Sequence, residues 1–159
     1  MAGTTVTLKV DNIVVQLDAY WLRHYAGDYL SAAEQFTPPP NRFSPVRHYL
    51  FCHSIELSLK SFLFTVGLKR TDRKKLNHDL QRTLKSAEDR GLGTHVSIST
   101  LDRDQIARID NLYSAKEFEY FESLAMIYDP LPFDPIAIES LAKRLHLGIE
   151  APVRASTIK

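Results

Sequence analysis

Apolar and aromatic residues recur at intervals of three and four along most of this chain, with polar residues between them. This spacing is typical of amphipathic helices, whereas strands alternate at every second residue. Prolines, glycines and residues suited to capping divide the pattern into separate segments. Little strand and short connections make the expected fold all-α, an up-and-down helical bundle. The five predicted helices cover residues 12–36, 44–67, 77–90, 99–115 and 134–148.

The helix predicted over residues 44–67 is apolar on most of its circumference, which is typical of a helix at the centre of a bundle. Ser44 suits its N-cap, Pro45 its first turn and Gly67 its end. It also carries two polar strips. One consists of His53, Glu56 and Lys60, between two apolar faces; the other, Ser54, Ser58 and Ser61, predicts a narrow solvent strip or a close contact with another helix.

Other segments carry weaker patterns. Alternating residues predict an extended arm or a small hairpin over residues 1–11, and the form of residues 116–133 is left open. The cations between Lys69 and Lys75 predict a basic loop that can dock phosphate. Asn77 suits the cap of the following helix, and we expect residues 150–159 to be a frayed tail.

The composition is that of a globular protein, and we predict a single domain over residues 1–159. Hydrophobic residues make up 44% of the 159 positions and charged residues 25%, with a formal net charge of +1. No apolar run is long enough to span a membrane, and the N-terminus lacks a secretory pattern, so we expect a cytoplasmic protein. A single cysteine, Cys52, excludes internal disulfides and the usual Cys-based zinc sites. Mixed charge outside the basic segment disfavours a duplex-DNA binder.

One stretch of the chain carries a recognisable order of motifs. It consists of residues His53 to Leu63, then Gly67, a basic segment and His78-Asp79-Leu80. It resembles the pattern of bacterial and archaeal HEPN-like (higher eukaryotes and prokaryotes nucleotide-binding) helical domains. Those domains read roughly as A-x-E-x-x-L-K, a glycine, and His-Asp-Leu opening the next helix. The resemblance implies an α-helical bundle, often dimeric. The superfamily includes RNA-cleaving toxins, partners of nucleotidyltransferases and many members without assigned activity.

Catalytic members of that superfamily share an arginine followed, after a short spacer, by a histidine. Chance alone gives about one such pair in a chain like this, so a pair by itself is no evidence. Our first choice is Arg47 with His53, although residues six apart do not share a helical face. The histidine would take the proton of a ribose 2′-hydroxyl, while the arginine would hold the scissile phosphate. The pairs present are Arg42 with His48, Arg47 with His53, Arg73 with His78, and Arg90 with His95.

The strip of His53, Glu56 and Lys60 has two interpretations. In the structural one, Glu56 and Lys60 form a helix ion pair, His78 hydrogen-bonds to Glu56 from the next helix, and Asp79 satisfies the amides at that helix's start. In the functional one, His53, Glu56, Lys60 and His78 line a polar pocket for a nucleotide or another anion. Lys74 and Lys75 would steer that ligand. The candidate ligand-binding residues are therefore Glu56, Lys60, His78, Asp79, Lys74 and Lys75.

A metal site is a weaker hypothesis, carried by His24 with Asp28 and by His53 with Glu56. Carboxylate-bridged metal bundles need glutamates from several helices, and the repeated Glu-x-x-His motif is missing. We therefore predict neither a metal nor a cofactor.

Aromatic residues bear on assembly. Trp21 and the tyrosines of the first helix recur with the helical period, so we expect them in the core or an interface. Because the aromatic surface exceeds what one small core needs, we predict a homodimer. The residues behind that prediction are Tyr20, Tyr113, Phe118, Tyr120 and Phe121.

The function expected is that of a nucleotide- or RNA-associated binding or partner domain, with a nucleotidyltransferase as one candidate partner. Two alternatives stay open. One is a metal-independent ribonuclease of the HEPN toxin type, and the other is a purely structural dimerisation module.

Overall fold

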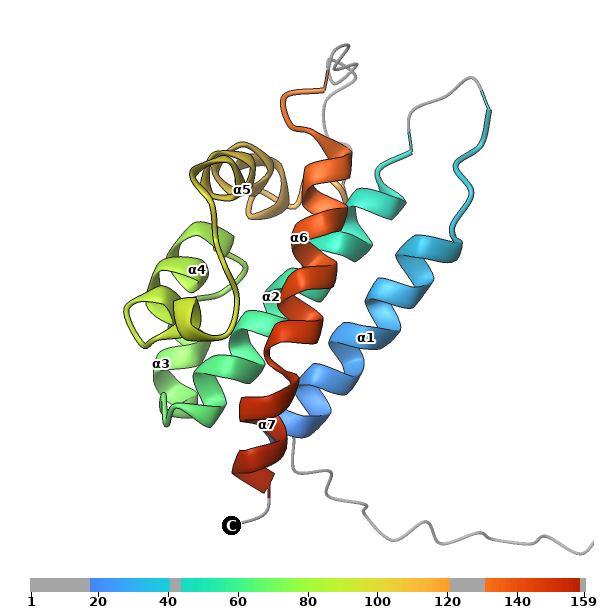
Figure 1. Cartoon of the computed structure of the whole chain (residues 1–159). Coiled ribbons are helices and arrows are strands. Elements are labelled where there is room, and N and C mark those ends of the chain that lie inside the picture. Colours follow the sequence, from blue (N-terminus) through green and yellow to red (C-terminus); the bar gives the residue numbers. More distant parts are fainter. Residues whose placement is uncertain (1–17, 41–43, 121–130, 158–159) are drawn as a thin grey trace, which may run out of the picture.

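The computed structural model describes residues 18–40, 44–120 and 131–157, and within them it is an all-α helical bundle without a strand (Figure 1). The all-α fold class is therefore confirmed. None of the helices in these ranges is both long and apolar enough to cross a membrane. The elements are α1 (Ala19–Gln35), α2 (Val46–Thr65), α3 (Arg70–Lys75), α4 (Leu80–Glu88), a 3₁₀ turn (Leu92–Thr94), α5 (Thr100–Tyr113), α6 (Pro135–Gly148) and α7 (Glu150–Thr157).

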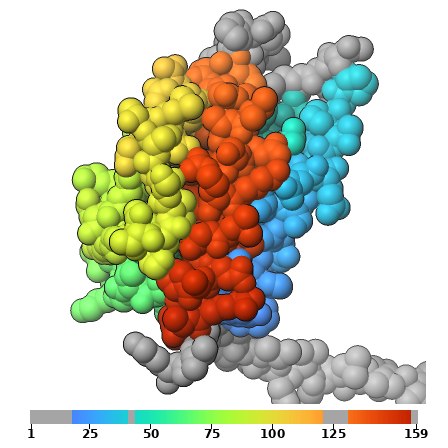
Figure 2. Space-filling view, viewed as in Figure 1, coloured from blue at the N-terminus to red at the C-terminus, as the bar shows by residue number. Residues whose placement is uncertain are grey.

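The central helix is α2, which packs against α1, α3, α4, α6 and α7. In the space-filling view, α6 and α7 run between α1 and α4 and cover most of α2 (Figure 2). The C-terminus of α2 is closed by Gly67, whose φ of +81° is readily available only to glycine. The amide of Leu68 then donates to the carbonyl of Leu63 at 2.9 Å, which completes a Schellman motif. At the other end, Pro45 and not Ser44 occupies the N-cap, without a side-chain hydrogen bond, so the predicted serine cap was wrong.

The serine strip of α2 is a close helix contact and not a solvent strip. Ser54 and Ser61 are fully buried, and their hydroxyls donate to the carbonyls of Ala26 and Ala19 at 2.8 and 2.6 Å. One heptad earlier on α2, Arg47 Nε donates to the carbonyl of Ala33 at 3.2 Å. Three alanines spaced by seven on α1 thus meet three donors spaced by seven on α2. This is the repeat expected of two antiparallel helices that wrap closely around each other.

The expectation that aromatic residues of α1 lie in the core was wrong for Trp21 and Tyr25, and their place in an interface stays a prediction. The residues that α1 buries are Ala19, Ala26, Leu30 and Ala33, whereas Trp21 and Tyr25 remain 40% and 39% exposed. All of these positions recur with the helical period, so the period alone does not choose between them. The small side chains face α2 because only they allow the backbones to approach closely enough for the serine hydrogen bonds.

Two predicted irregular segments are helical. The basic segment forms α3, although none of its residues is buried, and the expected frayed tail forms α7, where Val153 is buried and Arg154 pairs with Glu150 at 2.6 Å. Asn77 does not cap the next helix, because its φ of +46° turns the chain before it. Asp79 caps α4 instead, by accepting from the amide of Arg82 at 2.7 Å. The expected N-terminal arm and Phe121 lie outside the described residues.

The later helices begin near residues 99 and 134, as predicted. A capping box of Ser99 and Asp102 opens α5, and Asp134 with Pro135 opens α6. Arg144 of α6 donates to the Asp102 carboxylate at 2.5 Å, so this cap also ties α6 to α5. Contacts between Arg47 and Glu139, near the starts of α2 and α6, indicate that these two helices run in the same direction (Figure 1).

We predict that Ala26→Leu lowers the free energy of unfolding by about 1–3 kcal/mol, because the larger side chain would force α1 away from α2. Urea unfolding monitored by circular dichroism measures this loss. The matched control is Ala32→Leu, at an exposed position of the same helix, for which the change should stay within about 0.5 kcal/mol. Equal losses in the two variants would contradict close packing at Ala26.

Candidate functional site

A buried carboxylate, Glu56, organises the polar strip of α2. Its side chain is 3% exposed, and three groups donate to it: Lys60 Nζ to Oε1 at 2.5 Å, Tyr113 Oη to Oε2 at 2.5 Å, and His78 Nδ1 to Oε2 at 3.0 Å. Burial acts to raise the pKa of Glu56, but the charge of Lys60 and these hydrogen bonds outweigh it and hold the pKa below its ordinary value. Glu56 is therefore a carboxylate at neutral pH. We call His53, Glu56, Lys60, His78 and Tyr113 the Glu56 network.

The tautomer of His53 follows from this arrangement. The single hydroxyl proton of Tyr113 is directed to Glu56, so the phenol oxygen accepts from His53 Nδ1, which lies 2.8 Å away. Burial lowers the pKa of His53 more strongly than Glu56 raises it, which favours the neutral ring with its proton on Nδ1. Tyr29 of α1 packs edge-on against this ring at 4.3 Å between centroids, and Tyr49 stacks on it at 5.7 Å.

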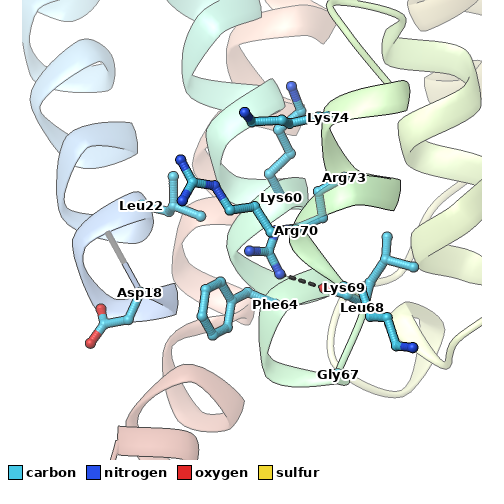
Figure 3. Close-up of a pocket in the computed structure, with 10 residues that line it drawn as sticks. All are labelled: Asp18, Leu22, Lys60, Phe64, Gly67, Leu68, Lys69, Arg70, Arg73 and Lys74. Carbon is cyan, nitrogen blue, oxygen red and sulfur yellow. Dashed lines mark hydrogen bonds between the residues drawn. The ribbon is translucent and has the colours of Figure 1, made fainter. Parts of the chain in front are cut away.

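Lys60 connects the Glu56 network to an open pocket between α1, α2 and α3. Its ammonium group donates to the carbonyl of Asn77 at 2.6 Å as well as to Glu56, and its side chain lines the pocket. The pocket has a volume of about 660 Å³, and Figure 3 shows basic side chains of α3 across from the first turn of α1. We call this the basic pocket. Its lining residues are Asp18, Leu22, Lys60, Phe64, Gly67, Leu68, Lys69, Arg70, Arg73 and Lys74.

Positive charge dominates the basic pocket. Among the described residues that line it, five are lysine or arginine, and the one carboxylate, Asp18, already accepts from the amide of Trp21 at the start of α1. The guanidinium of Arg73 lies 4.0 Å from the centre of the Phe64 ring and donates to the carbonyl of Leu68 at 2.5 Å. Burial and then the neighbouring charge of Arg70 lower the pKa of Arg73, although it stays protonated at any physiological pH. An anion in the pocket would relieve this repulsion between like charges.

The structure gives Arg47 and His53 different partners. Arg47 pairs with Glu139 of α6 at 2.9 Å and lies over the ring of Phe51, whereas His53 contacts Tyr29, Tyr49 and Tyr113. The two side chains leave α2 in different directions, as their spacing of six residues requires.

The other candidate residues divide into three groups. His78 joins Glu56 as predicted, and Lys74 lines the basic pocket together with Lys60. Asp79 caps α4, and Lys75 pairs with Asp72 at 3.0 Å. The structure therefore brings His53, Glu56, Lys60 and His78 together, while Asp79 and Lys75 have other contacts.

Phe64 and Tyr113 were not candidate site residues, and Arg70 and Arg73 were considered only within the basic segment and, for Arg73, as a chance-level pair with His78. Arg73 and Lys74 follow Arg70 by three and four residues, so they lie on the same side of the helix as Arg70 once the basic segment is helical. That spacing was readable in the sequence and was missed because the segment was interpreted as a loop. Tyr113 was named among the aromatic residues behind the homodimer prediction, and nothing in the sequence pairs it with a glutamate 57 positions earlier.

Within residues 18–40, 44–120 and 131–157, no three histidine, cysteine, aspartate or glutamate side chains are grouped so that they could hold a metal ion. No protein-family model matches the chain. Searches of curated proteins and of solved structures gave no match either.

We predict that Glu56→Gln lowers the free energy of unfolding by about 2–4 kcal/mol, because Lys60 and His78 lose a charged acceptor inside the protein. Urea unfolding at pH 7 measures it. As a control, Glu88→Gln removes the exposed pair with Arg103 and should cost less than about 1 kcal/mol. A similar small cost for both variants would mean that Glu56 is effectively solvated.

His48 supplies a pH dependence that is independent of Glu56. Its ring packs against Phe133 at 5.1 Å, and burial, followed by the charge of Arg47, lowers its pKa from 6.5 to about 4. Between these values the unfolded chain binds a proton that the folded chain does not, so stability falls as the pH falls.

We predict that the free energy of unfolding decreases by roughly 1–3 kcal/mol as the pH is lowered from 6.5 to about 4.5, and that His48→Gln flattens this slope. Denaturant unfolding at several pH values tests this prediction. The wild type and the variant are compared above pH 4.5, the ordinary pKa of a glutamate side chain. A wild-type slope in the variant would contradict the assignment.

Proposed function

We propose that this all-helical domain binds a phosphate-bearing ligand, a nucleotide or RNA, in the basic pocket. The observation that supports this most is the concentration of five cations around one open pocket, where the one carboxylate among the described lining residues, Asp18, already caps a helix. Phosphate oxygens accept several charge-assisted hydrogen bonds at once, and lysine and arginine are the side chains that supply them.

The lining residues differ in how firmly they are held, which supports a division of roles. Arg73 is held by Phe64 and the Leu68 carbonyl, and Lys60 by Glu56 and the Asn77 carbonyl. Lys69, Arg70 and Lys74 are exposed and can reach a ligand from solvent. In this proposal the first two cations define the position of the phosphate, and the exposed three complete its neutralisation.

The Glu56 network acts in this proposal as a positioning device. Glu56 and the Asn77 carbonyl fix the Lys60 ammonium group at the pocket wall, and Tyr113 and His78 fix Glu56. Holding a cation before the ligand arrives reduces the side-chain entropy that binding would otherwise cost. The HEPN-like resemblance, with its nucleotide- and RNA-associated members, points to the same class of ligand.

Several further expectations belong to the proposal. They are a cytoplasmic location, a homodimer and a nucleotidyltransferase as partner protein. Among the residues behind the predicted dimer, Tyr20 and Tyr120 are exposed and available to an interface, whereas Tyr113 and Phe118 are buried within the chain. A purely structural dimerisation module is the alternative in which the basic pocket takes no ligand.

The double variant Arg70→Ala/Lys74→Ala should weaken binding of ATP by at least about tenfold, because each removed cation takes a charge-assisted hydrogen bond with it. Isothermal titration calorimetry at low and moderate salt measures the loss. The matched control, Lys85→Ala/Arg108→Ala, removes two exposed cations of α4 and α5 that pair with aspartates and should keep wild-type affinity.

The alternatives separate in the same set of experiments. If the wild type binds neither ATP nor RNA, the proposal is contradicted and the purely structural dimerisation module becomes the remaining alternative. Incubation with a mixed RNA pool in chelator tests the ribonuclease. Cleavage that disappears in a folded His53→Ala or His78→Ala variant would establish that alternative, and intact RNA together with binding would support the proposal made here.

A further inference from the structure

Four aromatic rings lie together on the exposed side of α1. Tyr20, Trp21 and Tyr25 are 46%, 40% and 39% exposed, and His24 between them is exposed as well. Trp21 is in edge contact with Tyr20 and His24 at centroid distances of 5.7 and 5.8 Å, Tyr20 stacks on His24 at 6.2 Å, and Trp21 lies 6.4 Å from Tyr25. We call these four residues the aromatic patch.

The aromatic patch borders the basic pocket. Asp18 and Leu22 of α1 line the pocket, and Tyr25 lies on the same side of the helix, seven residues after Asp18 and three after Leu22. Trp21, three residues after Asp18 and four before Tyr25, neighbours Tyr25 on the helix surface. Each residue adds about 1.5 Å along the axis, so Trp21 and Tyr25 lie within about one helical turn of the pocket wall. A ligand that fills the pocket can therefore continue directly onto the rings.

Core packing does not account for the aromatic patch, because the residues that α1 buries are Ala19, Ala26, Leu30 and Ala33. Single exposed apolar residues are ordinary on protein surfaces, but a contiguous group of large aromatic rings marks an interaction surface. Aromatic rings next to concentrated positive charge match one ligand chemistry in particular. Nucleobases stack on such rings, while the phosphates that join them are neutralised by lysine and arginine.

We propose that the aromatic patch and the basic pocket together bind single-stranded nucleic acid, with phosphates in the pocket and unstacked bases on the rings. This inference rests on the proposed function and narrows its ligand. A single nucleotide is held in the pocket by its phosphates, whereas only a strand of several nucleotides extends beyond the pocket and covers a patch of four rings.

The test compares a strand with a single nucleotide. A fluorescently labelled eight-adenosine RNA is titrated with the full chain and followed by anisotropy, and ATP binding is measured in parallel. The double variant Trp21→Ala/Tyr25→Ala should weaken binding of the RNA by at least about tenfold and leave the affinity for ATP within about twofold. Both residues are exposed, so the fold should survive, which circular dichroism verifies.

The matched control is Leu101→Ala/Ile136→Ala, which removes two exposed apolar side chains from α5 and α6 and should bind the RNA like the wild type. The single variant Trp21→Phe, which keeps a ring, should retain most of the affinity. The same eight-base sequence as DNA shows whether the ribose hydroxyl contributes, and binding of either single strand supports the inference.

Four results would overturn it. Unchanged RNA affinity in the double variant would remove the aromatic patch from the site. A wild-type protein that binds ATP but not the RNA would refute the single-stranded ligand while the proposed function stood. A wild-type protein that binds neither ligand would refute both. Light scattering decides the fourth: a wild-type dimer that dissociates in Trp21→Ala/Tyr25→Ala would assign the patch to a second copy of the chain.

Discussion

The arrangement of this protein depends on a charged carboxylate buried in its central helix. Removing Glu56 from water is costly unless its oxygens receive strong donors, and the donors come from three places: Lys60 on α2 itself, His78 before α4, and Tyr113 at the end of α5. Satisfying one carboxylate therefore fastens α4 and α5 to α2. Because Lys60 also holds the Asn77 carbonyl, it fastens the end of α3 as well, and α3 forms a wall of the basic pocket.

The opposite side of α2 imposes a second constraint. Buried serine hydroxyls need acceptors, and those of Ser54 and Ser61 find them in carbonyls of α1 because the small alanines of α1 keep the two backbones close. This close contact leaves no room for rings, so Tyr20, Trp21 and Tyr25 lie outside. The same packing that stabilises the pair of helices thus puts Leu22 at the basic pocket and Trp21 and Tyr25 beside it.

Much of this was readable along the chain where a signal is local. The helix starts near residues 99 and 134, the glycine stop at Gly67 and the meeting of His78 with Glu56 were all predicted and are confirmed. Two of the failures share one physical cause. In α1, two sets of residues with the same period compete, and in α3 a charged segment has no apolar face, so in both cases contacts from elsewhere decide.

The sequence by itself determined the all-α class, the ends of most helices and the polar strip of α2, because helical period, caps and ion pairs depend on residues within a few positions of one another. Only the tertiary structure decided which face of α1 is buried, that Tyr113 completes the Glu56 network, and that Lys60 and the cations of α3 surround one pocket. Those outcomes join residues far apart in the chain, and their energies come from packing and desolvation, which no local pattern contains.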